Sequence, residues 1–382
     1  MGGRSQGANR WRAMVWGVIL TTLGACAAPA APAPVAPAAS TPTASAARAA
    51  PTAAPTSPEE LTKIRLAALN GSSNVPFRLG DERGYFAQEG IDLDMVAFAS
   101  NSEMIPALAT GQLDMVPMPS NPATWNAIAR NTPVKLVLDV ITYRPGGLSD
   151  QMLSIRKAVL DAGRWHGLAD LRGLSLAITP PGKGTASACA LSVALQQVGM
   201  TLDDLDIEPL PFPEMTAAIT NGAIDAGVMA EPFATRAEQQ GSAQRVLGLG
   251  DMYPNFTIST VGFADALYAN HPVAKGFVRA YLRAVREYRA AVNGQSGDAA
   301  REQMYDLIAR GTGMDIATVR AITLPYMNPN GLPNRESVLY CYQFFRDQGL
   351  VPQPVPEATM RNLWGADLVN EVLDEIGRVP EN

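Results

Sequence analysis

The sequence predicts an α/β protein of two similar lobes, each built on a mostly parallel sheet with helices on its faces. The first observation is an alternation of strand-like and helix-like runs from residue 64 onward. The second is an ungapped internal repeat with an offset of 111 residues, in which EMIPALATGQLDM (103–115) matches EMTAAITNGAIDA (214–226). Such an alternation is typical of parallel sheets, and a repeat that spans strands, loops and a helix indicates two related units.

The first unit contains five expected elements between residues 64 and 118. Apolar runs bounded by loop residues predict the strands, and apolar residues spaced by three or four positions predict the helices. Gly111 is placed to end a helix, because glycine readily adopts the left-handed conformation found there. In order, the elements are strand IRLAAL (64–69), a helical stretch through LGDERGYFAQEG (79–90), strand IDLDMVAF (91–98), helix SEMIPALATG (102–111) and strand LDMVPM (113–118).

The repeat carries the same order of elements into the second unit. The offset places strand residues 65–69 on 176–180. In open α/β sheets, ligands bind beyond the carboxyl ends of the strands. Four loops follow such strand ends and are the candidate ligand loops: 70–74, 118–122, 179–187 and 229–233.

One of these loops, PPGKGTAS at 180–187, contains the residue types of a phosphate cradle. A P-loop needs the pattern GxxxxGK[ST], but here the order is G-K-G-T, and Ala177 stands five positions before Gly182. Nucleotide hydrolysis is therefore not expected. The loop leads into the helix TASACALSVALQQVG (185–199), whose first N–H groups favour a negatively charged ligand. A loop without any ligand role is the alternative, and Lys183 is expected to face solvent.

The N-terminus predicts an exported lipoprotein. Three arginines precede a short apolar run, AMVWGVILTTL, which is followed by LGAC at 23–26. This order resembles a bacterial signal peptide over 1–25 that ends in a lipobox, which implies cleavage before Cys26 and a lipid on its thiol. A plain signal peptide or a membrane anchor is the alternative.

The segment after the cysteine predicts a tether. Residues 27–58 contain 15 Ala and 8 Pro, a composition that cannot bury a core and in which proline interrupts any helix. We therefore expect residues 26–58 to connect the lipid to a folded part of more than 300 residues, from 59 to 382, which is long enough for two cores.

Charge and cysteine content exclude several kinds of partner for residues 59–382. This part has 26 basic and 36 acidic side chains, a formal net charge of −10, which argues against a nucleic acid. Cys189 and Cys341 match no metal-binding spacing, and neither a metal nor a cofactor is predicted. These two cysteines could pair in an exported protein, but we expect two buried thiols.

Longer motifs resemble a known family. GYFAQEGIDLDMV, ADLRGLSLAITPPGKGT, AAITNGAIDAGVMAEPFATRAE and FVRAYLRAVREY are similar to the periplasmic binding proteins for nitrate, sulfonates, taurine and thiamine-pyrimidine precursors, which serve ABC importers. The resemblance runs from about 63 to 345. It implies a two-lobe periplasmic-binding-protein fold with a two-strand hinge. The implied boundaries are 59–145 and 256–382 for lobe one and 146–255 for lobe two.

The resemblance also implies ligand contacts at the strand ends. Glu231 lies in AEPF, where the family has a WEPF-like motif; Ala230 replaces the aromatic residue, and Glu231 is either a ligand contact or a structural hydrogen-bonding residue. Arg144 could bind a sulfonate or carboxylate through two hydrogen bonds, or it could be a solvated surface residue. The full set of expected ligand-binding residues is Asn70, Ser72, Ser73, Asn74, Ser120, Asn121, Tyr143, Arg144, Thr179, Gly184, Thr185, Ala186, Ser187 and Glu231.

The function that follows is solute capture for an importer. The resemblance implies a lipid-anchored monomer at the outer face of a bacterial membrane that binds a small anionic or polar molecule and delivers it to an ABC permease and its ATPase. A ligand-binding sensor and a protein for a pyrimidine-like heterocycle are the alternatives. An enzyme is not expected, because a fungal branch that makes the thiamine pyrimidine uses a cysteine-rich run and histidine. Here that run is lacking, and only His166 and His271 are present.

Overall fold

The computed structural model describes residues 61–68, 71–98, 101–146 and 149–381. The predicted signal peptide, Cys26 and the tether lie outside the described residues, and so does Asn70. Within the described part of the chain, no helix combines the length and the apolar character that crossing a bilayer requires.

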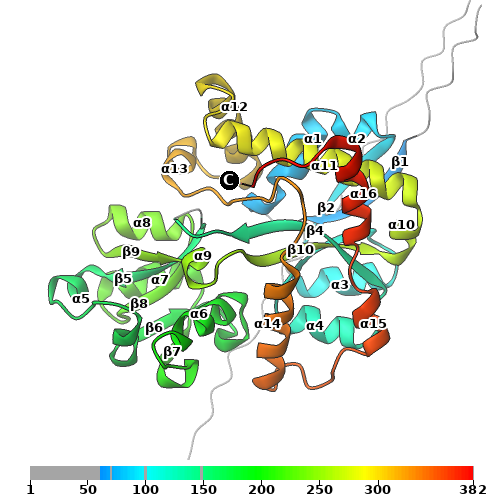
Figure 1. The fold of residues 1–382 in the computed structure, drawn as a ribbon. Helices are drawn as coiled ribbons and strands as arrows, with labels where there is room; N and C mark the ends of the chain where they lie inside the picture. Colours follow the sequence, from blue (N-terminus) through cyan, green and yellow to red (C-terminus); the bar gives the residue numbers. More distant parts are fainter. Residues whose placement is uncertain (1–60, 69–70, 99–100, 147–148, 382) are drawn as a thin grey trace, which may run out of the picture. The chain divides into compact units, whose positions relative to one another are not determined.

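The first sheet has five strands, four of which run in the same direction. β1 pairs in parallel with its neighbours on both sides, and β10 pairs antiparallel with β3 and β4. In spatial order the strands are β2 (Ile91–Ala97), β1 (Thr62–Ala68), β3 (Met115–Pro119), β10 (Phe256–Ala264) and β4 (Val134–Tyr143). Figure 1 shows this sheet with helices packed around it.

The second sheet repeats this arrangement. β6 pairs in parallel with both neighbours, and β5 is the antiparallel strand. In spatial order the strands are β7 (Asp206–Pro209), β6 (Ser175–Ile178), β8 (Ala226–Ala230), β5 (Gln151–Arg156) and β9 (Ala243–Gly248). The antiparallel strand of each sheet is the first one formed after the chain passes between the sheets. The predicted α/β class with two sheets flanked by helices is confirmed.

The internal repeat corresponds to equivalent elements. Shifted by 111 residues, β3 falls on β8 without a gap. The same shift places α3 (Asn101–Ala109) on α7 (Phe212–Asn221) and α4 (Pro122–Ala129) on α8 (Phe233–Gln239). The structure therefore confirms the two related units.

Helices that precede β5 or follow β10 accompany the first sheet. The 22-residue α11 buries an apolar face, on which Phe277 packs 5.0 Å from Phe86 and Tyr281 packs 4.9 Å from Phe77, measured between ring centroids. Besides α3 and α4, these helices are the 3-10 turn η1 (Ser72–Asn74), α1 (Val75–Glu82), α2 (Tyr85–Gln88), α10 (Asp265–Ala269), α11 (His271–Val292), α12 (Asp298–Thr312), α13 (Ile316–Ala321), α14 (Arg335–Asp347), α15 (Glu357–Asn362) and α16 (Ala366–Ile376).

Helices between β5 and β10 accompany the second sheet. α7 and α8 enclose a small separate core in which Met215, Ile219 and Met229 are fully buried. Besides α7 and α8, these elements are α5 (Lys157–Asp161), η2 (Leu168–Gly173), η3 (Gly182–Gly184), α6 (Ala186–Gln196), η4 (Leu202–Asp204) and α9 (Leu249–Met252). α6 instead belongs to the larger core, which it shares with α14.

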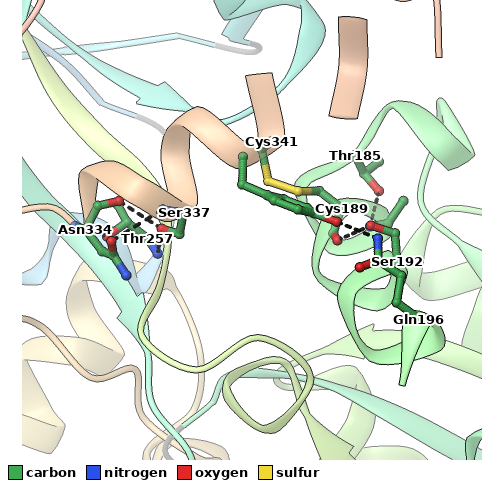
Figure 2. Close-up of a disulfide and its surroundings, with 10 residues drawn as sticks. Thr185, Cys189, Ser192, Gln196, Thr257, Asn334, Ser337 and Cys341 are labelled. Carbon is green, nitrogen blue, oxygen red and sulfur yellow. Dashed lines mark hydrogen bonds between the residues drawn. A yellow bond between two sulfur atoms is a disulfide. The ribbon is translucent and has the colours of Figure 1, made fainter. Parts of the chain in front are cut away.

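Cys189 and Cys341 form a disulfide, with Cα atoms 5.7 Å apart. The expectation of two buried thiols is therefore wrong. The two residues are 152 positions apart, and only the packing of α14 against α6 brings them together (Figure 2).

Candidate functional site

Two of the four predicted loops meet, one from each sheet. Gly184 in the loop after β6 lies so close to its neighbours that a Cβ atom there would be 3.7 Å from Cγ of Pro122 and 3.5 Å from Cδ1 of Leu350. Pro122 is the first residue of α4, in the loop after β3. The added Cβ would also lie 2.9 Å from Cγ of Pro181, closer than such carbon atoms ordinarily approach. Pro181 in the same loop is therefore the neighbour that favours glycine at position 184.

The loop after β6 is held by its own side chains. The backbone N–H of Gly182 donates to the carbonyl of Thr179 over 2.8 Å. Thr185 is the N-cap of α6: its Oγ1 accepts from the N–H of Ala188 over 3.1 Å and donates to the carbonyl of Gly182 over 3.0 Å. Ala186 and Ser187 are the first two residues of α6. Their backbone N–H groups therefore have no acceptor within the helix. Both residues are buried.

The side chain of Ser187 connects α6 to the first strand of the second sheet. Its hydroxyl donates to Oε1 of Gln151 over 2.7 Å. Gln151 pairs in register with Ala230 at the end of β8, so this residue connects two of the predicted loops. Sequence reasoning missed Gln151, because it lies on the non-repeated strand β5 and matches no motif.

We expect the double variant Thr185→Ala with Ser187→Ala to fold but to lose about 2 kcal/mol of unfolding free energy. Loss of an N-cap hydroxyl costs about 1 kcal/mol, and loss of one buried hydrogen bond costs about as much again. Urea denaturation measures the change. Thr185→Ser keeps the capping oxygen and is the matched control. A loss below about 0.5 kcal/mol, the usual range for surface changes, would contradict the capping role.

The loop after β3 is also held by its polar residues. The backbone N–H of Ser120 donates to the carbonyl of Ile258 over 2.8 Å, and Oδ1 of Asn121 caps α4 by accepting from the N–H of Thr124 over 2.9 Å. Ser120 lines a cavity of about 10 Å³, roughly the room of one water molecule. Its Oγ and Nε1 of Trp125, which lines the same cavity, have no hydrogen-bond partner among the described residues.

The loop after β1 is described in part. Ser73 is half-buried and Asn74 is 2% exposed, directly before α1. The backbone of Ser72 belongs to η1.

Glu231 is engaged in a structural network. Its carboxylate, 3% exposed, pairs with Arg245 over 3.0 Å. It also accepts from the backbone N–H of Thr235 and from that of Thr323, each over 3.1 Å. Thr323 follows α13, which comes after the second sheet in the sequence. Of the two roles expected for Glu231, this geometry matches the structural hydrogen-bonding residue.

Tyr143 and Arg144 both have partners within the protein. Tyr143 is 1% exposed, and its hydroxyl donates to Oδ1 of Asp150 over 2.7 Å. Burial and the neighbouring Asp150 raise the pKa of Tyr143 well above its usual value. Arg144 forms an ion pair with Glu381 and lies 4.7 Å from the ring centroid of Tyr326. The described residues of the first crossover therefore include no unpaired cation. The ligand-binding roles of Tyr143 and Arg144 remain predictions.

The predicted loops are uncharged on balance. Lys183, expected to face solvent, forms an ion pair with Asp203 on η4, and Glu231 is neutralised by Arg245. What the described loops offer a ligand is therefore backbone N–H groups and side-chain hydroxyls. No group of three or more potential metal-binding side chains occurs in the described part of the chain.

Comparison with known proteins agrees with this architecture. A model of the NMT1-like family matches residues 57–308. A protein of Brucella abortus that bears the name "Putative binding protein" is 23% identical over 243 residues, which cover 59% of this chain and 71% of the relative.

Solved structures share the fold at low identity. The periplasmic aliphatic sulphonate binding protein SsuA from Escherichia coli has a TM-score of 0.61 and 20% identity, covering 81% of this chain and 93% of its own. The periplasmic nitrate-binding protein NrtA from Synechocystis PCC 6803 has a TM-score of 0.63 and 16% identity, covering 83% and 90%. The desulfurization enzyme DSZB has a TM-score of 0.54 and 15% identity, covering 82% and 99%. Since binding proteins and an enzyme share the fold, the fold alone does not decide between binding and catalysis.

Proposed function

This chain belongs to the NMT1-like family, and on that basis we propose that it is the extracytoplasmic solute-binding component of an ABC importer. The observation that carries the proposal is the contact between the loops after β3 and β6, which come from different sheets and meet at Gly184 and Pro122. A small molecule held between such loops contacts both lobes at once. Binding then couples to the relative position of the lobes, which a permease can recognise.

The proposed ligand is a small anionic or strongly polar molecule, with sulfonates, nitrate and taurine as the first candidates. The start of α6 supports an anion, because its first N–H groups and the helix dipole favour negative charge. The proposed contacts are the strand-end residues predicted from the sequence, Ser187 and its neighbours in 179–187 among them.

A neutral heterocycle is the second candidate ligand. It is favoured by the pairing of Lys183 with Asp203 and of Arg144 with Glu381, which leaves the described loops without a free cationic side chain. A fully charged anion would then depend on backbone and hydroxyl donors alone.

A thermal-shift panel on the purified Cys26→Ser protein tests the proposal. The panel contains nitrate, sulfate, alkyl and aryl sulfonates, taurine, aromatic carboxylates and pyrimidines. A ligand at 100 times its Kd adds about 2.7 kcal/mol, which is expected to raise the Tm by about 5–10 °C. A flat panel, together with native mass spectrometry that shows no co-purified molecule, would contradict solute binding.

We also propose that Cys26 carries a lipid and that residues 26–58 tether the binding part to the membrane. The support is the order of basic residues, apolar run and LGAC in the sequence. Cys26→Ser is expected to move the protein from the membrane fraction to the soluble fraction, which detergent extraction and immunoblotting measure. Retention of a cleaved Cys26→Ser protein in the membrane fraction would rule out the anchor.

A further inference from the structure

The disulfide joins helices that belong to different lobes. Cys189 lies in α6, four residues after the Thr185 cap, and Cys341 lies in the middle of α14. Figure 2 shows the bond between the two helices, with Thr185 at the start of α6. The predicted ligand loop is thus about one helical turn from a covalent bond to the C-terminal part of the chain.

The start of α14 is fixed to the first sheet. Ser337 Oγ accepts from the backbone N–H of Thr257 on β10 over 3.1 Å. The backbone N–H of Asn334 donates to Oγ1 of the same threonine over 2.8 Å. Asn334 also caps α14, and its Nδ2 donates to the carbonyl of Asn255 over 2.8 Å.

The far end of α14 is fixed to α4 of the same lobe. Tyr342 packs on the buried Trp125, with ring centroids 4.6 Å apart. Nδ2 of Asn126 donates to the carbonyl of Leu350, just beyond the helix, over 3.0 Å. Both ends of α14 are therefore attached to lobe one, and the helix moves with that lobe.

α6 is attached to the second sheet in the same way. Cys189, Leu191 and Leu195 are fully buried, and Ser187 is hydrogen-bonded to Gln151 on β5. The disulfide consequently links a helix attached to the second sheet with a helix attached to the first. A second contact reinforces it two helical turns further along α6, where Nε2 of Gln196 donates to the hydroxyl of Tyr340 over 2.8 Å.

Another contact between the lobes, at Thr323, is not covalent. Its backbone N–H donates to Glu231, and its Oγ1 accepts from Arg245 over 3.4 Å. Thr323 follows α13, which packs on α12 and is held there by the ion pair between Arg320 and Glu302. α12 in turn packs on α1 and α11 of lobe one. Hydrogen bonds at a partly exposed site open far more readily than a disulfide.

We propose that the Cys189–Cys341 disulfide is a fixed pivot for lobe motion, so that the lobes separate at the Glu231–Thr323 contact while the loop 179–187 stays on α14. The inference rests on the proposed function, because it concerns the motion that admits the solute. In a hinged binding protein, the crossover strands are the usual covalent connections between the lobes. Here a third covalent connection restricts the opening to one side.

Distances between non-cysteine spin labels, measured without any added solute, test the pivot. The full chain with Cys26→Ser is used, so that Cys189 and Cys341 are the remaining cysteines. One pair, at Gln197 and Asp347, spans the disulfide side. The other, at Gln239 and Ala317, spans the Thr323 side. All four side chains are exposed. The distances are compared with those of a Cys189→Ala, Cys341→Ala variant, and Ser192→Ala is the control, because it changes α6 and leaves the disulfide intact.

In the disulfide-bonded protein, a narrow distribution is expected for the Gln197–Asp347 pair and an about twofold wider one for the Gln239–Ala317 pair. In the double alanine variant, the Gln197–Asp347 distribution is expected to widen to a similar extent. If the Gln197–Asp347 distribution is the same in both proteins while the Gln239–Ala317 distribution is wide, the pivot is overturned and the proposed function stands. Narrow distributions for both pairs in both proteins would overturn the lobe motion itself. Non-reducing peptide mapping that finds two thiols in the exported protein would overturn the pivot at its first step.

Discussion

Replacing both Cys189 and Cys341 with alanine is expected to lower the free energy of unfolding by about 4–5 kcal/mol. The disulfide spans 152 residues, and a cross-link that closes so long a loop removes much of the conformational freedom of the unfolded chain. The folded state loses little, since both side chains are small and lie in an otherwise well-filled core. Guanidinium denaturation without reductant measures the difference.

Two comparisons separate the cross-link from packing. Ser192→Ala, in the same buried face of α6, removes a hydroxyl that donates to the carbonyl of Cys189 and is expected to cost only about 1 kcal/mol. Adding reductant to the unsubstituted protein should reproduce most of the effect of the double substitution, and adding it to the double variant should change nothing. A loss below about 1 kcal/mol for the double variant would show that the cross-link does not restrict the unfolded chain.

The fold could be predicted because it is repeated. Chance similarity between two strand–helix units is common, but a register that holds over two strands, a loop and a helix is a property of the whole unit. β3 and β8 accordingly occupy equivalent places in their sheets. The antiparallel strands β5 and β10 also occupy equivalent places, but they lie outside the matched sequence segments. They were located only as the places where the chain changes lobe.

The candidate site could be predicted only as loops. Thr185 was predicted at a helix start and Asn121 at a strand end, and both are N-caps. Their side chains are therefore already engaged by the protein. Partners such as Glu381 for Arg144, 237 residues away, depend on how the C-terminal segment is laid over the first crossover. No local pattern in the sequence contains that information.

The disulfide was missed for a related reason. Cysteines in α6 and α14 each match an ordinary buried position, and spacing gives no evidence of pairing when 152 residues intervene. The deciding fact is that α14 lies against both α4 and α6, drawn in orange between them in Figure 1. That placement follows from tertiary packing, which the periodicity of a single helix does not encode.

Stability is expected to fall as pH rises from about 4 to about 7, because of Asp139. This residue on β4 is 1% exposed, and burial raises its pKa to about 7. Hydrogen bonds from Thr142 and Asn328 oppose the increase, and the charge of Glu381 adds to it. In the unfolded chain the same carboxyl has a pKa near 3.8. Between these values the folded protein holds a proton that the unfolded chain has lost, so unfolding releases a proton and a higher pH favours it.

The shift of about three pKa units corresponds to about 4 kcal/mol, present below pH 4 and lost by pH 7. Asp139→Asn should remove this dependence. Its carbonyl can accept from the backbone N–H of Asn328, as Oδ2 of Asp139 does. Its amide can donate to the hydroxyl of Thr142, which can then donate to Thr257. The variant is expected to match the wild type near pH 4 and to be more stable by up to about 4 kcal/mol at pH 8.

Urea denaturation of both proteins at pH 4 and pH 8 measures the difference, and Asp92→Asn on the exposed face of β2 is the control. A pH-independent difference between wild type and Asp139→Asn would contradict a buried proton. The position of this proton gives the result a functional meaning. Asp139 bonds to Thr142 over 2.7 Å, and Thr142 bonds to Thr257 over 2.6 Å. β4 leads into the first crossover, and β10 begins directly after the second. The loss of the proton would therefore place a negative charge where both crossovers join the first sheet.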